Sequence, residues 1–193
     1  LKILAPDYRP SMAKRSDLIF SQLHLYEHMT FDTFDTYSQY HEEQTNWTNV
    51  SNYAKAFTQR PQQWIAFTGT FGSGKTHLSA AISNELNNRG HQVMFTTIPE
   101  LMDYLRVTFD PKTNVRFDKR FQEIKDAPIL VLDDLSLESA TSRAKEKLFQ
   151  IIDHRYIKKM PTIFTTAIKS AELDPRLKTR LTDTRLCEII AIK

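Results

Sequence analysis

The stretch from Gly69 to Thr76 constrains the fold of this chain more than any other part of the sequence. It reads Gly-Thr-Phe-Gly-Ser-Gly-Lys-Thr, with two glycines five positions apart followed directly by Lys75 and Thr76. This is the spacing of a phosphate-binding loop, in which glycines let the backbone curl until its N–H groups point inward at a polyphosphate. The helix that follows such a loop adds the positive end of its dipole.

The motif assigns a chemical role to its residues. Lys75 supplies a point charge to the outer phosphates of a nucleotide, and the Thr76 hydroxyl is suited to coordinate Mg²⁺. The residues that we expect to contact the nucleotide are Gly69, Thr70, Phe71, Gly72, Ser73, Gly74, Lys75, Thr76 and His77.

The context of the loop makes an accidental match improbable. The four fixed positions would meet by chance in roughly one chain in a hundred of this length, and three of the 4 glycines of the chain lie inside the loop. Residues 63–68 have the pattern of a strand that leads into the loop. After it, apolar residues keep helical spacing up to Gly90, which suits the end of a helix. Strand, loop and helix are the context that the motif needs.

Further segments with a strand pattern alternate with segments that have a helix pattern. Strands are predicted at 91–97, 129–132, 161–166 and 186–192, and helices at 99–109, 115–126, 141–156 and after Pro175. The run Ile129–Leu132 is continuously apolar, which is typical of a strand buried on both faces. The alternation predicts an α/β fold, a three-layer sandwich whose five-stranded parallel sheet is covered by helices on both faces.

The N-terminal part of the chain has a less regular pattern. We expect a short helix within 17–29, a loop over the polar residues 37–48, and a helix that begins at Asn49 or Ser51 and runs to Arg60. Between them, Phe31 and Phe34 lie three apart in a turn-like stretch, where they either plug a loop into the core or shape a pocket for a base. Residues 1–28 are expected to be an extension or linker, and 29–193 the nucleotide-binding domain.

The composition is that of a globular domain. Of the 193 residues, 40% are hydrophobic and 25% are charged, and no apolar run approaches the ~20 residues that cross a membrane. The single cysteine, Cys187, excludes an intramolecular disulfide and, with a nucleotide site, predicts a cytoplasmic protein. The net charge of +3 and the pI of about 8.9 are compatible with a nucleic-acid partner but do not indicate one.

A second motif lies about sixty residues after the loop. The apolar run Ile129–Leu132 ends in Asp133 and Asp134, which resembles a Walker B element. A buried strand would carry these carboxylates to the edge of the sheet where ligands bind in such folds. We therefore expect Asp133 to hold Mg²⁺ and Asp134 to orient or activate the attacking water.

With both motifs in place, the sequence from Met29 to Lys193 resembles the AAA+ ATPases of the DnaC and DnaI helicase-loader group and the related IstB-like proteins. The resemblance rests on Thr30–Phe34, Gly74–Leu78, Leu130–Leu135, Pro161–Thr166 and Arg176–Leu181, which occur in the order of that family. It implies ATP with Mg²⁺ as cofactors, ATP-dependent self-association, and a lid domain that is absent or minimal.

The resemblance also implies roles for individual residues. Phe31 and Phe34 would lie near the adenine. The end of the fourth strand would carry sensor 1, a polar residue near the γ-phosphate, here Thr166. The arginine finger that reaches the ATP of a neighbouring subunit would be Arg180 by position, with Arg176 and Arg185 as alternatives to it.

Two departures from the family pattern bear on activity. The usual Walker B element ends in Asp-Glu, whereas this chain has Asp133-Asp134, and the usual sensor asparagine is replaced by Ala167. Both changes permit ATP binding and predict weak ATPase activity. Three functions follow from these features: a loader that acts on a replicative helicase and meets single-stranded DNA, an IstB-like helper that delivers a transposase to DNA, and a nucleotide-gated switch with little hydrolysis.

Overall fold

One parallel sheet forms the centre of the computed structural model, which describes residues 21–35, 41–107, 114–137, 140–168 and 172–193. Within these ranges the strand order is β2-β3-β4-β1-β5, and every pair is parallel. The strands are β1 (Trp64–Thr68), β2 (Val93–Thr97), β3 (Ile129–Asp133), β4 (Thr162–Thr166) and β5 (Cys187–Ala191). The two central strands β3 and β4 are buried along their whole length, which the apolar run Ile129–Leu132 predicts for β3. The predicted five-stranded parallel sheet is confirmed.

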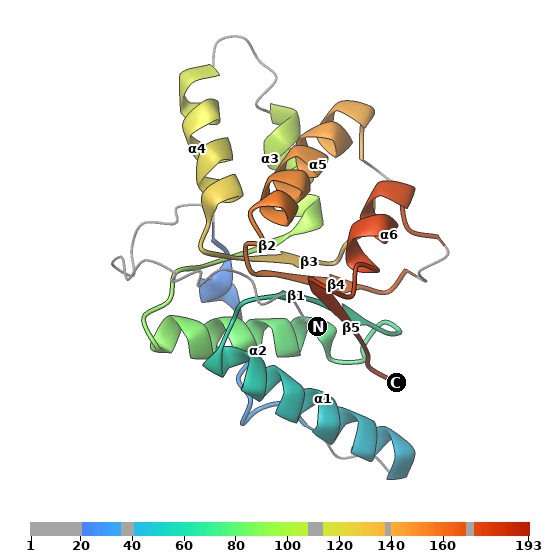
Figure 1. Cartoon of the computed structure of the whole chain (residues 1–193). Helices are drawn as coiled ribbons and strands as arrows, with labels where there is room; N and C mark the ends of the chain where they lie inside the picture. The colour runs from blue at the N-terminus through green and yellow to red at the C-terminus, as the bar shows by residue number, and fades with distance from the viewer. Residues whose placement is uncertain (1–20, 36–40, 108–113, 138–139, 169–171) are drawn as a thin grey trace.

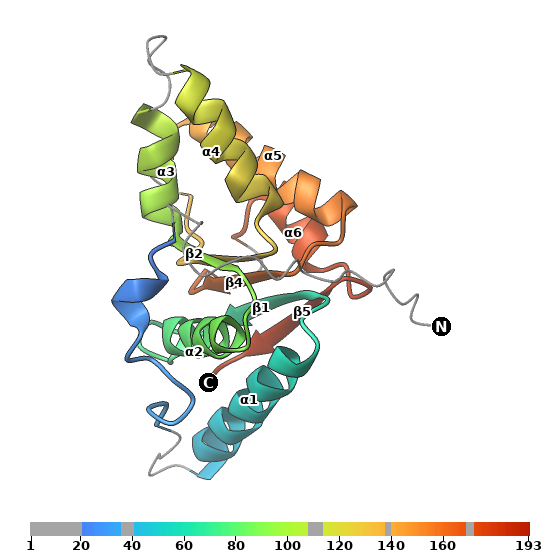
Figure 2. The ribbon, with the colours of Figure 1, turned by 90° about the vertical axis from the view of Figure 1, so that its left-hand side faces the viewer.

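Helices cover both faces of this sheet, as Figures 1 and 2 show. One face carries α3 (Ile98–Val107), α4 (Asn114–Asp126), α5 (Ser142–Ile157) and α6 (Pro175–Leu181), and the other carries α1 (His41–Gln59), α2 (Lys75–Asn88) and the 3₁₀ turn η1 (Leu23–Tyr26). The residues of β1 alternate between the two apolar cores, Trp64 in one and Ile65 in the other. This is the predicted three-layer sandwich. No helix in the described ranges is long and apolar enough to cross a membrane.

The helix α1 begins earlier than the sequence predicted. It starts at His41, so the expected loop over 37–48 and the expected start at Asn49 or Ser51 are wrong from residue 41 onward, while 36–40 lie outside the described residues. The polar first turns are held by distant backbone: Asn46 Nδ2 donates to Ala191 O at 3.1 Å, and Trp47 Nε1 donates to Lys193 O at 2.7 Å. Because these hydrogen bonds join residues far apart in the chain, the local sequence of the helix carries no pattern that would predict them.

The helix expected within 17–29 is also corrected. In the described part of that range, from residue 21 on, only the single 3₁₀ turn Leu23–Tyr26 forms, and Leu23 is its buried residue. The side chain of Asn84 on α2 donates to Tyr26 O at 2.9 Å and to Met29 O at 2.8 Å. These bonds hold the segment from Tyr26 to Met29 against α2.

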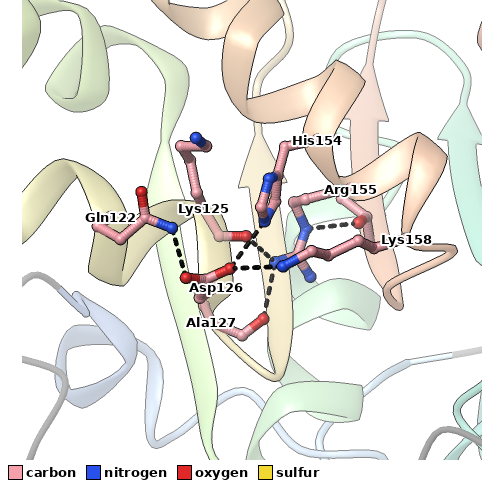
Figure 3. A network of polar contacts seen from close by, with 8 residues as sticks. Gln122, Lys125, Asp126, Ala127, His154, Arg155 and Lys158 are labelled. Carbon is pink, nitrogen blue, oxygen red and sulfur yellow. Dashed lines mark hydrogen bonds and ion pairs between the residues drawn. The ribbon is translucent and has the colours of Figure 1, made fainter.

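A buried arginine ties α4, α5 and β4 together at the amino end of the sheet (Figure 3). Arg155 is fully buried on α5, and its guanidinium donates to Lys125 O, Ala127 O, Pro161 O and Thr162 Oγ1 at 2.6–3.1 Å. Beside it, the carboxylate of Asp126 accepts from His154 Nε2 at 2.7 Å and lies 3.5 Å from Lys158 Nζ. Figure 3 shows these groups packed against one another between the helix ends. The network holds the starts of β3 and β4 against the end of α5.

Candidate nucleotide-binding site

The predicted phosphate loop connects β1 to α2 at the carboxyl edge of the sheet. Its backbone needs glycine at Gly74, which has φ of 90° and lies so close to Phe34 that a Cβ would meet the ring Cε2 atom at 2.7 Å. Gly69 is equally constrained, because a Cβ there would collide with the backbone of Ile192. The glycine spacing in the sequence is therefore explained by backbone shape and by close neighbours.

Lys75 opens α2 and turns back into the loop. Its ammonium donates to Gly69 O at 3.0 Å, to Thr70 O at 2.6 Å and to Ser73 Oγ at 3.3 Å. Burial lowers the pKa of Lys75, and the negative charges of Asp133 and Asp134 act in the opposite direction. The loop thus encloses a cation, which is the centre that a polyphosphate site requires.

The two residues that we predicted as metal ligands contact each other. Thr76 Oγ1, from the first turn of α2, donates to Asp133 Oδ2 at the end of β3 over 3.0 Å. Asp133 is 3% exposed, and burial raises its pKa while the hydrogen bonds from Thr165 and Thr76 act to lower it. A hydroxyl and a carboxylate oxygen side by side are a donor set that fits Mg²⁺. The assignment of the metal to them stays a prediction.

Asp134 adopts an unusual backbone conformation beside the loop. Its φ is 56°, in the left-handed region, and its side chain is exposed. Its N–H donates to Thr165 Oγ1 at 2.8 Å, and the Thr165 hydroxyl donates in turn to Asp133 Oδ1 at 2.7 Å. Sequence reasoning missed Thr165. It lies one position past the last paired residues of β3 and β4, Leu132 and Phe164, so only the register of the two strands could have singled it out.

Thr166, the predicted sensor residue, forms its hydrogen bonds with the backbone. Its hydroxyl donates to Leu135 O at 3.0 Å and accepts from Ile168 N at 3.0 Å. A cavity of about 360 Å³ lies between the end of the sheet and α6, and its lining includes Thr70 of the loop together with Thr166 and Ala167. The structure thus brings the end of β4 and the loop to one cavity, while a sensor role for Thr166 stays a prediction.

The aromatic residues near the loop fall into two groups. Phe34 lies edge-on to His77, with ring centroids 5.4 Å apart, and His77 Nε2 lies 2.9 Å from Thr30 O. Phe31 instead packs toward α1, with Lys55 Nζ 5.7 Å from its ring centroid. Phe71 is 86% exposed at the tip of the loop. Phe34 and His77 are therefore the residues of this set that adjoin the start of α2, and their contact with adenine stays a prediction.

Arg180 is held by its own chain. Its Nε lies 2.7 Å from Asp153 Oδ1 on α5, and its Nη1 donates to Arg176 O at 2.8 Å. The other two candidates for the finger are more exposed: Arg176 stacks on the Phe149 ring at 3.6 Å, and Arg185 pairs with the neighbouring Asp183. All three arginines thus have partners within the chain, and the identity of the finger stays a prediction.

Comparisons with known proteins agree with this geometry. The family model described as IstB-like ATP binding protein matches residues 9–190. The replicative helicase loader DnaI of Bacillus subtilis is 29% identical over 126 residues, which cover 64% of this chain and 40% of the relative. The replicative helicase loader DnaC of Escherichia coli K12 is 31% identical over 117 residues, 61% of this chain and 47% of the relative. The matched part of the chain spans less than half the length of either curated relative.

Solved structures show the same fold. The crystal structure of the DnaC helicase loader superposes with a TM-score of 0.71 at 24% identity, over 88% of this chain and 99% of that one. DnaA from Aquifex aeolicus, bound to AMPPCP, superposes with a TM-score of 0.70 at 21% identity, over 86% of this chain and 49% of that one. The chain belongs to the IstB-like ATP binding protein family and has the P-loop AAA+ fold of the DnaC and DnaI group.

Proposed function

We propose that this chain binds ATP with Mg²⁺ and uses binding and slow hydrolysis to load or remodel a protein assembly on DNA. The observation that carries the nucleotide part is the enclosure of the Lys75 ammonium by the loop, next to the contact of Thr76 with Asp133. Anionic phosphate oxygens are better partners for this cation than the carbonyl groups that it now contacts. When bound, Mg²⁺ supplies positive charge that neutralises the phosphates.

Different residues around the loop would have different roles in hydrolysis. The loop amides and Lys75 would hold the phosphates, and Asp133 with Thr76 would hold the metal ion. Asp134 would orient the attacking water, but its side chain is one methylene shorter than the usual glutamate. Ala167 has no polar group to assist it, which leaves Thr166 as the proposed sensor residue. These features support slow turnover, and they favour a nucleotide-gated switch as the alternative when hydrolysis is negligible.

Substitutions of Asp133 and Asp134 test these roles directly. Asp133→Ala should abolish Mg²⁺-dependent hydrolysis, because it removes the carboxylate that contacts Thr76. Asp134→Glu should raise the single-turnover rate or leave it level, because the longer side chain extends toward the water. Quenched-flow or radiolabel assays with excess enzyme measure both. A fast wild-type ATPase that Asp134→Glu cripples would contradict the assignment.

The protein partner is inferred from the relatives. The curated relatives are replicative helicase loaders, so we propose a replicative helicase as the partner, with single-stranded DNA beside it and the cytoplasm as the compartment. The family description favours a second candidate, an IstB-like helper of a transposase. Pull-downs with ATP, with ADP and without nucleotide separate the two. ATP-dependent capture of the helicase, lost in Lys75→Ala, supports the first, and capture of a transposase alone supports the second.

A trans-acting arginine can be tested by mixing subunits. If Arg180 serves the ATP of a neighbouring subunit, it must leave Asp153, and Arg180→Ala should spare ATP binding by the monomer. Arg180→Ala subunits mixed with Lys75→Ala subunits should then regain part of the ATPase activity. The same mixtures with Arg176→Ala or Arg185→Ala serve as comparisons. No recovery despite demonstrated co-assembly would move the role away from Arg180.

A further inference from the structure

The turn after β3 is fastened to β4 by one buried threonine. The Thr165 hydroxyl donates to Asp133 Oδ1 at 2.7 Å and accepts from the N–H of Asp134 at 2.8 Å. The Thr165 carbonyl accepts from the N–H of Leu135 at 2.7 Å. Thr165 is 1% exposed and lies in a central strand, between β1 and β3, so its hydroxyl has a fixed position. A single residue thus contacts three consecutive residues of the acidic turn.

The bond to Asp133 fixes the rotation of that carboxylate. Thr165 occupies Oδ1, where Ser79 Oγ lies at a longer 3.5 Å, and this leaves Oδ2 turned toward Thr76. A hydroxyl has one proton to give, and this one is given to Asp133 because the backbone N–H of Asp134 occupies the acceptor side. The direction of the hydrogen bonds is therefore set, and Oδ2 stays beside the Thr76 hydroxyl, where the metal ion is expected.

The bonds to the backbone maintain the conformation of Asp134. A left-handed φ is unfavourable for a residue other than glycine and persists where surrounding contacts impose it. Here the N–H groups of Asp134 and of Leu135 both donate to Thr165, one on each side of the Asp134 Cα atom. Asp134 is exposed, whereas its neighbour Asp133 is buried.

We propose that Thr165 is the positioning residue of the acidic pair. Its hydroxyl orients the Asp133 carboxylate toward the metal ion. The hydrogen bonds that Thr165 accepts from the N–H groups of Asp134 and Leu135 keep Asp134 turned toward the water. This inference rests on the proposed binding of ATP and Mg²⁺. Partners that orient a metal ligand change metal affinity by about 10- to 100-fold when they are removed. The hydroxyl of Thr165 should therefore control how much Mg²⁺ the site needs.

The test measures ATP affinity as a function of Mg²⁺ concentration. Thr165→Val keeps the shape and removes the hydroxyl, and Thr165→Ser keeps the hydroxyl. Valine should raise the Mg²⁺ concentration for half-maximal ATP binding about 10-fold and leave ATP binding in EDTA unchanged, while serine should stay close to wild type. Ser83→Ala is the matched control, because its buried hydroxyl on α2 donates to Ser79 O at 2.7 Å. If the valine variant does not fold, Thr165→Ala or Thr165→Cys replaces it.

The outcomes separate this inference from the proposed function. A folded valine variant with the Mg²⁺ midpoint of wild type overturns the role of Thr165 and leaves ATP binding intact. An equal shift in Ser83→Ala, or in Thr165→Ser, also overturns it, because the loss would then be a general effect of packing. A wild-type chain that shows no ATP binding overturns the proposed function, and the inference with it.

Discussion

Replacing Lys75 by alanine should abolish tight ATP binding and leave the domain folded. The ammonium of Lys75 lies among two carbonyl oxygens and one hydroxyl of the loop, at 2.6–3.3 Å, where the phosphates of a nucleotide are expected. Two hydrogen bonds to charged oxygens, at ~1.5 kcal/mol each, amount to about 3 kcal/mol, or about 100-fold in affinity. Titration with a fluorescent ATP analogue measures the loss.

Two further variants sharpen this experiment. Lys75→Arg keeps the charge but places a broad planar group among the same carbonyl oxygens, so it should recover little affinity. Lys147→Ala removes a lysine from α5, where its ammonium lies 4.9 Å from the Phe121 ring centroid, and should bind ATP like wild type. Circular dichroism of all three variants provides the folding control. An unchanged affinity in folded Lys75→Ala would remove the basis for a nucleotide site in this loop.

The sequence predicts those parts of the fold in which the local residue pattern favours the same structure as the tertiary packing. The run Ile129–Leu132 is continuously apolar and too short for most helices, so its length and composition identify β3, which is buried on both faces. The glycines of the loop are needed for backbone shape, so they are visible as a motif. The helix cap at Thr141, whose hydroxyl accepts from Ala144 N, likewise depends only on residues that are close in the sequence.

The parts that the sequence did not predict depend on residues far apart in the chain. The start of α1 depends on contacts of Asn46 and Trp47 with the last residues of the described chain, which no local periodicity reports. Thr165 became visible only through the register of β3 against β4. The partner of Arg180 is Asp153 on another helix, and an arginine that is exposed and one that is paired look alike in a sequence.

The second large effect concerns the stability of the sheet rather than the site. Arg155→Met should lower the free energy of unfolding by about 4 kcal/mol, because it leaves four acceptors of α4, β4 and the loops before the strands without the guanidinium that now binds them. Methionine fills much of the space, so the loss reports the hydrogen bonds more than a cavity. Urea unfolding measures it, with an expected fall of about 2 M in the midpoint.

Lys158→Met is the matched control, since Lys158 is 56% exposed and contributes one ion pair with Asp126 at 3.5 Å. It should change stability by less than ~0.5 kcal/mol. Arg155 adjoins the beginning of β4, whereas the phosphate loop follows the end of β1, so the two lie at opposite edges of a parallel sheet. Folded Arg155→Met should therefore bind ATP with wild-type affinity at low temperature. If Arg155→Met unfolds like wild type, water replaces the guanidinium at those carbonyl groups. If the folded variant binds ATP more weakly, the start of β4 determines where the carboxyl end of that strand lies.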